Sequence, residues 1–141
     1  LQHFAELAGL LDAKGLQIAI MGSSKEQKLA EQILSQSRSG HIIDLCGRTS
    51  LLDVIDLMAA SHSVVANDSG LMHLAYASGS SVHALYGSSS ALYTPPLSDH
   101  CEVYVEQQSC QPCFERTCRY EHYQCLFDIQ PQSLFDKIIN D

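Results

Sequence analysis

The sequence lacks any run of basic residues, and charged residues of either sign make up only 17% of its 141 positions. Eight Lys and Arg stand against sixteen Asp and Glu, which gives a formal net charge of -8. A surface that binds nucleic acid requires clustered positive charge, so the composition excludes a nucleic-acid partner. Because 45% of the residues are hydrophobic, a disordered chain is also excluded, and a globular protein is indicated.

No uninterrupted apolar stretch approaches the ~20 residues that a membrane-spanning helix needs. The amino end also lacks the basic and apolar regions of a signal peptide. These absences predict a soluble protein with no transmembrane segment. The chain begins at Leu1 rather than at Met, directly in a helical pattern, so we expect it to be a piece of a longer protein. Its length suits one domain, placed at 1–141.

Helical and strand-like patterns alternate along the sequence. Helices are predicted at 4–11, 29–34, 51–59, 71–78 and 133–139, and strands at 17–21, 42–45, 63–66, 82–86 and 102–105. The alternation predicts an α/β fold with a Rossmann-like open parallel sheet that carries helices on both faces. Only 109–126 matches no element.

Two helices show features that the structure can test directly. Gly15 is suited to end the first helix in the left-handed conformation. Thr49 or Ser50 can cap the third helix. Its apolar residues are expected to form one buried stripe: Leu51, Leu52, Ile55, Met58 and Ala59.

Open parallel sheets bind ligands at the carboxyl ends of their strands, which directs attention to the loops 22–25, 47–50, 67–71 and 87–94. In the third loop, the amides of Ser69, Gly70 and Leu71 should point out of a helix amino terminus. Such amides attract phosphate oxygens and suit a diphosphate. In an alternative interpretation, Asp68 only caps this helix and His73 fills the core one turn later.

Four stretches resemble the lipopolysaccharide heptosyltransferases of glycosyltransferase family 9. They are LCGRTSLL at 45–52, VVANDSGLMHLA at 64–75, ALYG at 84–87 and TPPLSD at 94–99. The segment CQPCF at 110–114 is similar to the heptosyltransferase II group within that family. The resemblance runs from about Phe4 to the end of the chain.

The resemblance implies the carboxyl-terminal, nucleotide-sugar-binding domain of a two-domain GT-B enzyme. Members transfer heptose from ADP-L-glycero-D-manno-heptose to the inner core of lipopolysaccharide with inversion. The resemblance assigns donor contacts to seven residues: Asp68 to the sugar hydroxyls, the amides of Ser69, Gly70 and Leu71 to the diphosphate, His73 to the same pocket, Thr49 to the adenine, and Glu26 to the ribose hydroxyls.

The same resemblance implies what the chain should lack. The family takes its catalytic base from an aspartate of the amino-terminal domain, which also faces the lipopolysaccharide acceptor, so no catalytic residue is expected here. Relatives carry a phosphate-contacting Lys before a Trp-Pro pair, and this sequence contains no Trp. That loop and the first strand of the domain are therefore expected to be missing. No cofactor is expected. The implied location is cytoplasmic, with peripheral association at the inner face of the inner membrane left open.

Four cysteines follow the spacing C-x2-C-x4-C-x6-C: Cys110, Cys113, Cys118 and Cys125. The first pair is typical of zinc or iron-sulfur sites, but the later spacing matches no standard zinc pattern. We therefore predict a loop packed by reduced thiols and no metal. A metal-stabilised interaction module on a Rossmann-like scaffold is the alternative function. A sugar-nucleotide epimerase of the same GT-B arrangement is a third possibility.

Overall fold

The structure is a computed structural model that describes residues 1–35 and 40–140. The chain divides into two compact units, Leu1–Val54 with Gln130–Asp141, and Ile55–Ile129. Each unit has a parallel sheet of its own, with helices packed against the strands. The prediction of an α/β fold with open parallel sheets is thus confirmed. None of the helices in the described ranges is long and apolar enough to cross a membrane.

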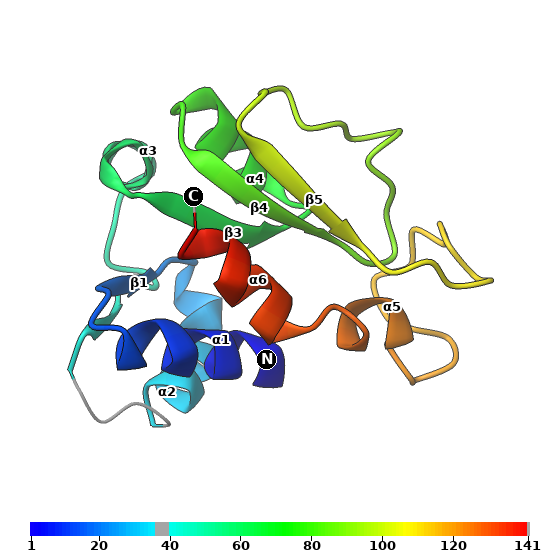
Figure 1. Cartoon of the computed structure of the whole chain (residues 1–141), viewed down its shortest axis with the longest axis horizontal. Helices are drawn as coiled ribbons and strands as arrows, with labels where there is room; N and C mark the ends of the chain where they lie inside the picture. Colours follow the sequence, from blue (N-terminus) through cyan, green and yellow to red (C-terminus); the bar gives the residue numbers. More distant parts are fainter. Residues whose placement is uncertain (36–39, 141) are drawn as a thin grey trace. The chain divides into compact units, whose positions relative to one another are not determined.

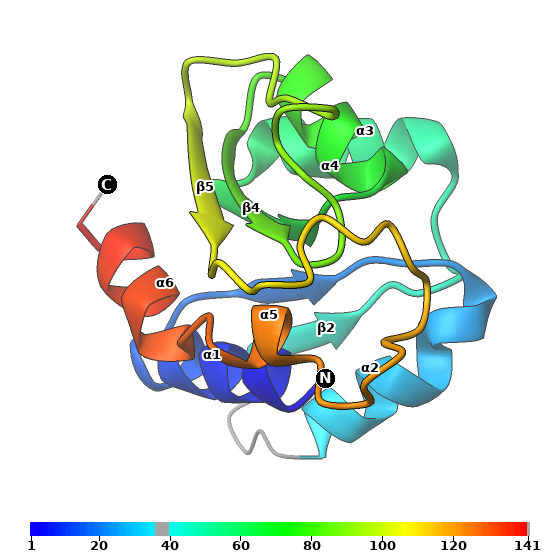
Figure 2. The same ribbon diagram turned by 90° about the vertical axis from the view of Figure 1, so that its right-hand side faces the viewer.

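The first unit is built on two parallel strands. β1 (Ile18–Ile20) pairs with β2 (Ile42–Asp44), and Ile18 lies opposite Ile42. The helices α1 (Gln2–Ala13) and α2 (Gln27–Leu34) lie on the same side of this pair (Figures 1 and 2), and α6 (Pro131–Ile138) packs against α1. A short 3-10 helix, η1 (Ser24–Glu26), precedes α2. The core joins α1, α2 and β2 through four buried residues: Ala5, Ala8, Ile33 and Ile42.

The predicted end of α1 is confirmed, because Gly15 adopts a φ of +78° two residues after the last helical residue. Only glycine enters this left-handed region without a steric penalty.

Helix α3 (Leu51–Ala60) confirms one prediction about its sequence and contradicts another. Ser50 is the cap, since the Asp53 amide donates to the Ser50 Oγ at 3.2 Å and the Asp53 carboxylate accepts from the Ser50 amide at 2.8 Å. The predicted apolar stripe is confirmed at Met58 and is wrong at Leu51, Leu52 and Ala59. Leu51 and Leu52 are 61% and 73% exposed, whereas Val54 and Met58, one turn apart, are buried. The buried face passes through Val54, and Leu52 lies about 160° around the helix from it.

The second unit is a sheet of three parallel strands in the order β3, β4, β5. They span Ser63–Asn67, Ser81–Tyr86 and Cys101–Val105. Helix α4 (Gly70–Ala77) connects β3 to β4 and packs on both strands (Figure 2). The central strand β4 is buried from Val82 to Tyr86, as expected of a strand with a neighbour on each side and helices against it.

The segment that matched no predicted element is irregular up to the short helix α5 (Gln124–Phe127). It packs against the carboxyl end of β4. The amides of Cys113 and Phe114 donate to the Ser88 carbonyl at 3.0 and 2.8 Å. Gly87 has no room for a side chain, because a Cβ there would come within 2.8 Å of Leu126.

Candidate functional site

Two loops meet at the carboxyl edge of the second unit's sheet. The Asp68 amide donates to the Leu85 carbonyl at 3.1 Å, which extends the ladder of β3 and β4 by one residue. Thr94, in the long loop that leads from β4 to β5 (yellow-green in Figure 1), donates its hydroxyl to the Asp68 Oδ2 at 2.9 Å. The Asp68 carboxylate therefore lies between the end of one strand and the loop that follows its neighbour.

The amino terminus of α4 begins directly after Asp68. Ser69 is the cap residue, in an extended conformation with φ -162° and ψ 171°, and its side chain makes no capping hydrogen bond. The His73 amide donates to the Ser69 carbonyl at 3.3 Å. The four amides up to Met72 thus have no acceptor within the helix, and helix termini of this kind bind anions. Gly70 is exposed, and nothing lies within 4 Å of where its Cβ would be.

The position of Asp68 contradicts the capping interpretation. The helix cap is Ser69, and the Asp68 carboxylate accepts from Thr94 instead. His73 is no core residue either, because 39% of its side chain is exposed. Its Nε2 lies 3.9 Å from the Asp68 Oδ1, so the imidazole and the carboxylate face one another across one turn of helix. The structure thus brings Asp68, the α4 terminus and His73 together.

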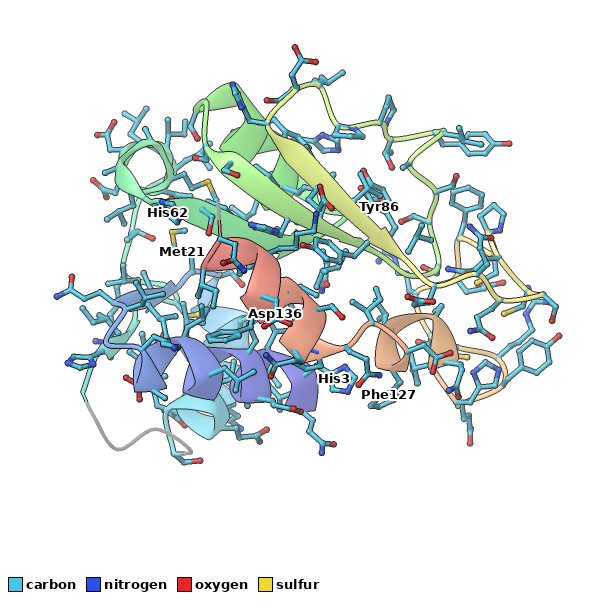
Figure 3. The ribbon with its side chains drawn as sticks, in the orientation of Figure 1. His3, Met21, His62, Tyr86, Phe127 and Asp136 are labelled. Carbon is cyan, nitrogen blue, oxygen red and sulfur yellow. The ribbon has the colours of Figure 1, made fainter. Side chains whose placement is uncertain are left out.

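Two residues beside this carboxylate were not predicted from the sequence to have a role there. Tyr86, the last residue of β4 (Figure 3), is completely buried and donates its hydroxyl to the Thr94 carbonyl at 2.5 Å. The pKa of Tyr86 is raised mainly by burial, and next by the negative charge of Asp68. Thr94 had a sequence signal, since it opens one of the stretches that resemble family 9. Nothing in the sequence indicated the hydrogen bond between Thr94 and Asp68, because the two residues are 26 positions apart.

The other two predicted residues, Glu26 and Thr49, belong to the first unit. The loops that carry them follow β1 and β2 and are tied together, since the Gly47 amide donates to the Gly22 carbonyl at 2.9 Å. Gly47 has a φ of +68°, and a Cβ there would come within 2.9 Å of the Ser24 backbone. Both its conformation and this close approach require glycine.

Glu26 has a structural role in its own helix. Its carboxylate accepts from the amide of Ser23 at 2.8 Å and from the Ser23 hydroxyl, and together these residues form a capping box for η1. The hydrogen bond from the Ser23 hydroxyl is the largest cause that lowers the pKa of this exposed carboxyl. Thr49 is half-buried in the turn before α3. The ribose contact of Glu26 and the adenine contact of Thr49 stay predictions.

All six cysteines are free thiols, and the four of the irregular segment line one pocket: Cys110, Cys113, Cys118 and Cys125. Backbone amides, that of Tyr123 first, hydrogen-bond to the Cys118 sulfur and lower the pKa of its thiol. Burial raises the pKa of Cys125. Within 1–35 and 40–140, no group of three or more His, Cys, Asp or Glu side chains is arranged to hold a metal ion.

Comparison with known proteins identifies relatives of one kind. The chain is 36% identical to lipooligosaccharide heptosyltransferase 2 of Haemophilus influenzae and 34% identical to lipopolysaccharide heptosyltransferase 2 of Escherichia coli, in each case over 96% of its length. It spans about 40% of the length of these curated relatives.

Solved structures agree with these relatives. The structure of E. coli ADP-heptose LPS heptosyltransferase II matches 98% of this chain with a TM-score of 0.82 at 35% identity, and the match covers 39% of that protein. A glycosyltransferase family 9 protein from Veillonella parvula matches 99% of this chain and 41% of its own with a TM-score of 0.80, and at 20% identity it supports the fold alone.

The sequence model described as glycosyltransferase family 9 (heptosyltransferase) matches residues 1–124. Since this match covers most of the chain, and both the relatives and the fold agree with it, the chain belongs to glycosyltransferase family 9, the heptosyltransferases.

Proposed function

We propose that this chain is the nucleotide-sugar-binding domain of an enzyme that transfers heptose from ADP-L-glycero-D-manno-heptose to the inner core of lipopolysaccharide, with inversion. One observation of the structure carries the proposal. A carboxylate that is only 13% exposed, that of Asp68, lies immediately before a helix amino terminus that has no side-chain cap. The first group can accept hydrogen bonds from sugar hydroxyls, and the second can bind a diphosphate.

The chemistry of transfer suits this pairing. When an acceptor hydroxyl displaces the nucleotide from the sugar, negative charge grows on the leaving diphosphate. The amides of Ser69, Gly70 and Leu71, joined by that of Met72, lie at the positive end of the α4 dipole and can stabilise this charge without reorganising. Asp68 accepts hydrogen bonds from the heptose hydroxyls, and His73 lines the same pocket from the next turn of α4. A metal ion is not needed for these steps.

The remaining roles rest on the resemblance to family 9. Thr49 neighbours the adenine, and Glu26 accepts from the ribose hydroxyls through the carboxylate that also caps η1. The base that deprotonates the acceptor is an aspartate of the family's amino-terminal domain, which meets the lipopolysaccharide core. The enzyme works in the cytoplasm, where nucleotide-activated sugars are made.

The alternatives have less support. The relatives reported above are named as heptosyltransferases, which favours a transferase over a sugar-nucleotide epimerase. A metal-stabilised interaction module would need converging ligands in the cysteine segment, and the described residues show no such group.

The test is a transfer assay with the full-length protein. It compares ADP-heptose with ADP-glucose, which has the same adenosine and diphosphate but a different sugar, in the presence of lipopolysaccharide that lacks its outer heptose. We expect heptose to appear on the acceptor by mass spectrometry and little glucose. Failure to bind or consume ADP-heptose would overturn the proposal.

A further inference from the structure

We propose that Thr94 is a positioning residue for donor recognition. Its hydroxyl holds the Asp68 carboxylate in the orientation in which it accepts hydrogen bonds from the sugar hydroxyls. The buried Tyr86 in turn fixes the position of Thr94. This inference rests on the proposed role of Asp68. It assigns a specificity function to a loop residue that does not itself contact the reacting atoms.

The hydroxyl of Thr94 lies near two acceptors. Its Oγ1 lies 2.9 Å from the Asp68 Oδ2 and 3.3 Å from the Ser90 carbonyl. A hydroxyl has one hydrogen, and the shorter contact, to a charged acceptor, takes the larger share of it. The carboxylate is thereby fixed through Oδ2, while Oδ1 stays on the side of His73, whose Nε2 is 3.9 Å away.

Thr94 is itself held from two directions. Its amide donates to the Ser90 carbonyl at 3.1 Å, in a turn that the Ser90 hydroxyl supports by accepting from the Leu92 amide at 3.2 Å. Its carbonyl accepts from the Tyr86 hydroxyl at 2.5 Å. Tyr86 lies at the carboxyl end of β4 with none of its surface exposed, so this anchor belongs to the rigid sheet.

The result is a continuous chain of hydrogen bonds from the sheet to the carboxylate. Tyr86 donates to Thr94, and Thr94 donates to Asp68. Tyr86 remains a neutral donor throughout the physiological range, because burial and the neighbouring carboxylate raise its pKa. A carboxylate already held in its binding orientation loses less conformational entropy when a ligand arrives. Removing the Thr94 hydroxyl should therefore weaken recognition of the sugar and leave recognition of the nucleotide unchanged.

The experiment uses the full-length enzyme with Thr94→Val, which keeps the shape of the side chain without the hydroxyl, and Thr94→Ser, which keeps the hydroxyl. Calorimetry measures the Kd for ADP-heptose and for ADP, and steady-state assays measure kcat and KM. We expect Thr94→Val to weaken ADP-heptose binding about tenfold, because the ligand must then immobilise the Asp68 carboxylate itself. ADP binding should stay close to wild type. Thr94→Val should also lower the Tm, because the largely buried Asp68 carboxylate loses its donor. Thr94→Ser should restore the Tm, and it should restore ADP-heptose binding to within about threefold.

A double-mutant cycle tests whether Thr94 acts through Asp68. If it does, Thr94→Val adds little to the loss already caused by Asp68→Asn. Full additivity of the two losses would overturn the proposal, as would equal weakening of ADP and ADP-heptose. If Asp68→Asn weakens ADP-heptose binding and Thr94→Val does not, Thr94 has no positioning role and the proposed function stands. If the wild-type enzyme does not bind ADP-heptose, the proposed function itself is wrong.

Discussion

Asp68 owes its suitability for sugar recognition to the neighbouring residues. Its side chain is only 13% exposed, and a carboxylate so far removed from water needs hydrogen-bond donors. One donor is present in Thr94, and the remaining lone pairs can accept from a ligand. Because Ser69 is the cap of α4, replacing Asp68 does not uncap the helix.

Asp68→Asn should therefore affect affinity rather than folding. The amide loses a charge-assisted acceptor and places a donor where a lone pair is needed, at a cost of roughly 1.5 to 3 kcal/mol, or about a tenfold to hundredfold weaker Kd for ADP-heptose. The Kd for plain ADP and the Tm should hardly change. Calorimetry on the full-length enzyme measures the Kd for ADP-heptose and the Kd for ADP.

Asp56→Asn is the matched control, because it removes the same charge from an exposed position on α3. It should leave both affinities unchanged. Equal losses of ADP and ADP-heptose in Asp68→Asn, or no loss of either, would mean that Asp68 does not read the sugar.

At the scale of the element, helix α3 offers a separate test of local structure. Ser50 and Asp53 cap its amino end reciprocally. Ser50→Ala should lower the free energy of unfolding by about 1 kcal/mol, as the loss of a cap usually does. Thr49→Ala, one residue earlier, is the control and should cost less. Urea unfolding of the full-length protein measures both, and a larger loss for Thr49→Ala would contradict the assignment of the cap.

The same cap should show a dependence on pH. The hydrogen bonds from Ser50 hold the pKa of Asp53 below its ordinary value of 3.8. A lowered carboxyl pKa contributes stability above the unfolded pKa, and this contribution is lost as pH falls through the folded pKa. The difference in stability between wild type and Ser50→Ala should therefore shrink below about pH 4. A difference that is constant from pH 7 to pH 3 would contradict this assignment.

The cysteine segment is a second element whose chemistry can be measured directly. Its four thiols line one pocket, but the described residues contain no group arranged to hold a metal ion. We predict that protein purified without chelator contains far less than one zinc or iron per chain by elemental analysis, and that chelators do not lower its Tm. About one ion per chain, lost together with stability on chelation, would show a structural metal site instead.

At the scale of the whole molecule, donor binding is proposed for this chain and the catalytic base for the amino-terminal domain. This leads to a prediction about residues 1–141 produced alone. They contain the proposed donor contacts but not the amino-terminal domain in which the base is proposed to lie. We expect no heptosyl transfer above background when donor and acceptor are both supplied, with the full-length enzyme as positive control. Turnover by residues 1–141 would mean that a residue of this chain acts as the base.

The sequence by itself determined the elements and their order, because these depend on interactions between near neighbours. The end of α1 before Gly15 follows from the steric freedom of glycine, and the start of α4 follows from the small residues 67–70 after an apolar strand pattern. The alternation of helices and strands is likewise a local pattern, and it was sufficient to predict parallel sheets. The stretches that resemble family 9 led to the family that the comparisons confirm.

Only the tertiary structure decided which face of α3 is buried and what holds Asp68. Val54 rather than Leu52 is buried, since burial depends on what packs against the helix as well as on helical spacing. The hydroxyl of Thr94 reaches Asp68 because β3 and β4 are parallel neighbours whose carboxyl ends lie at the same edge of the sheet. The spacing of neighbouring residues does not predict a contact between residues 26 positions apart. They exist only once the strands have paired.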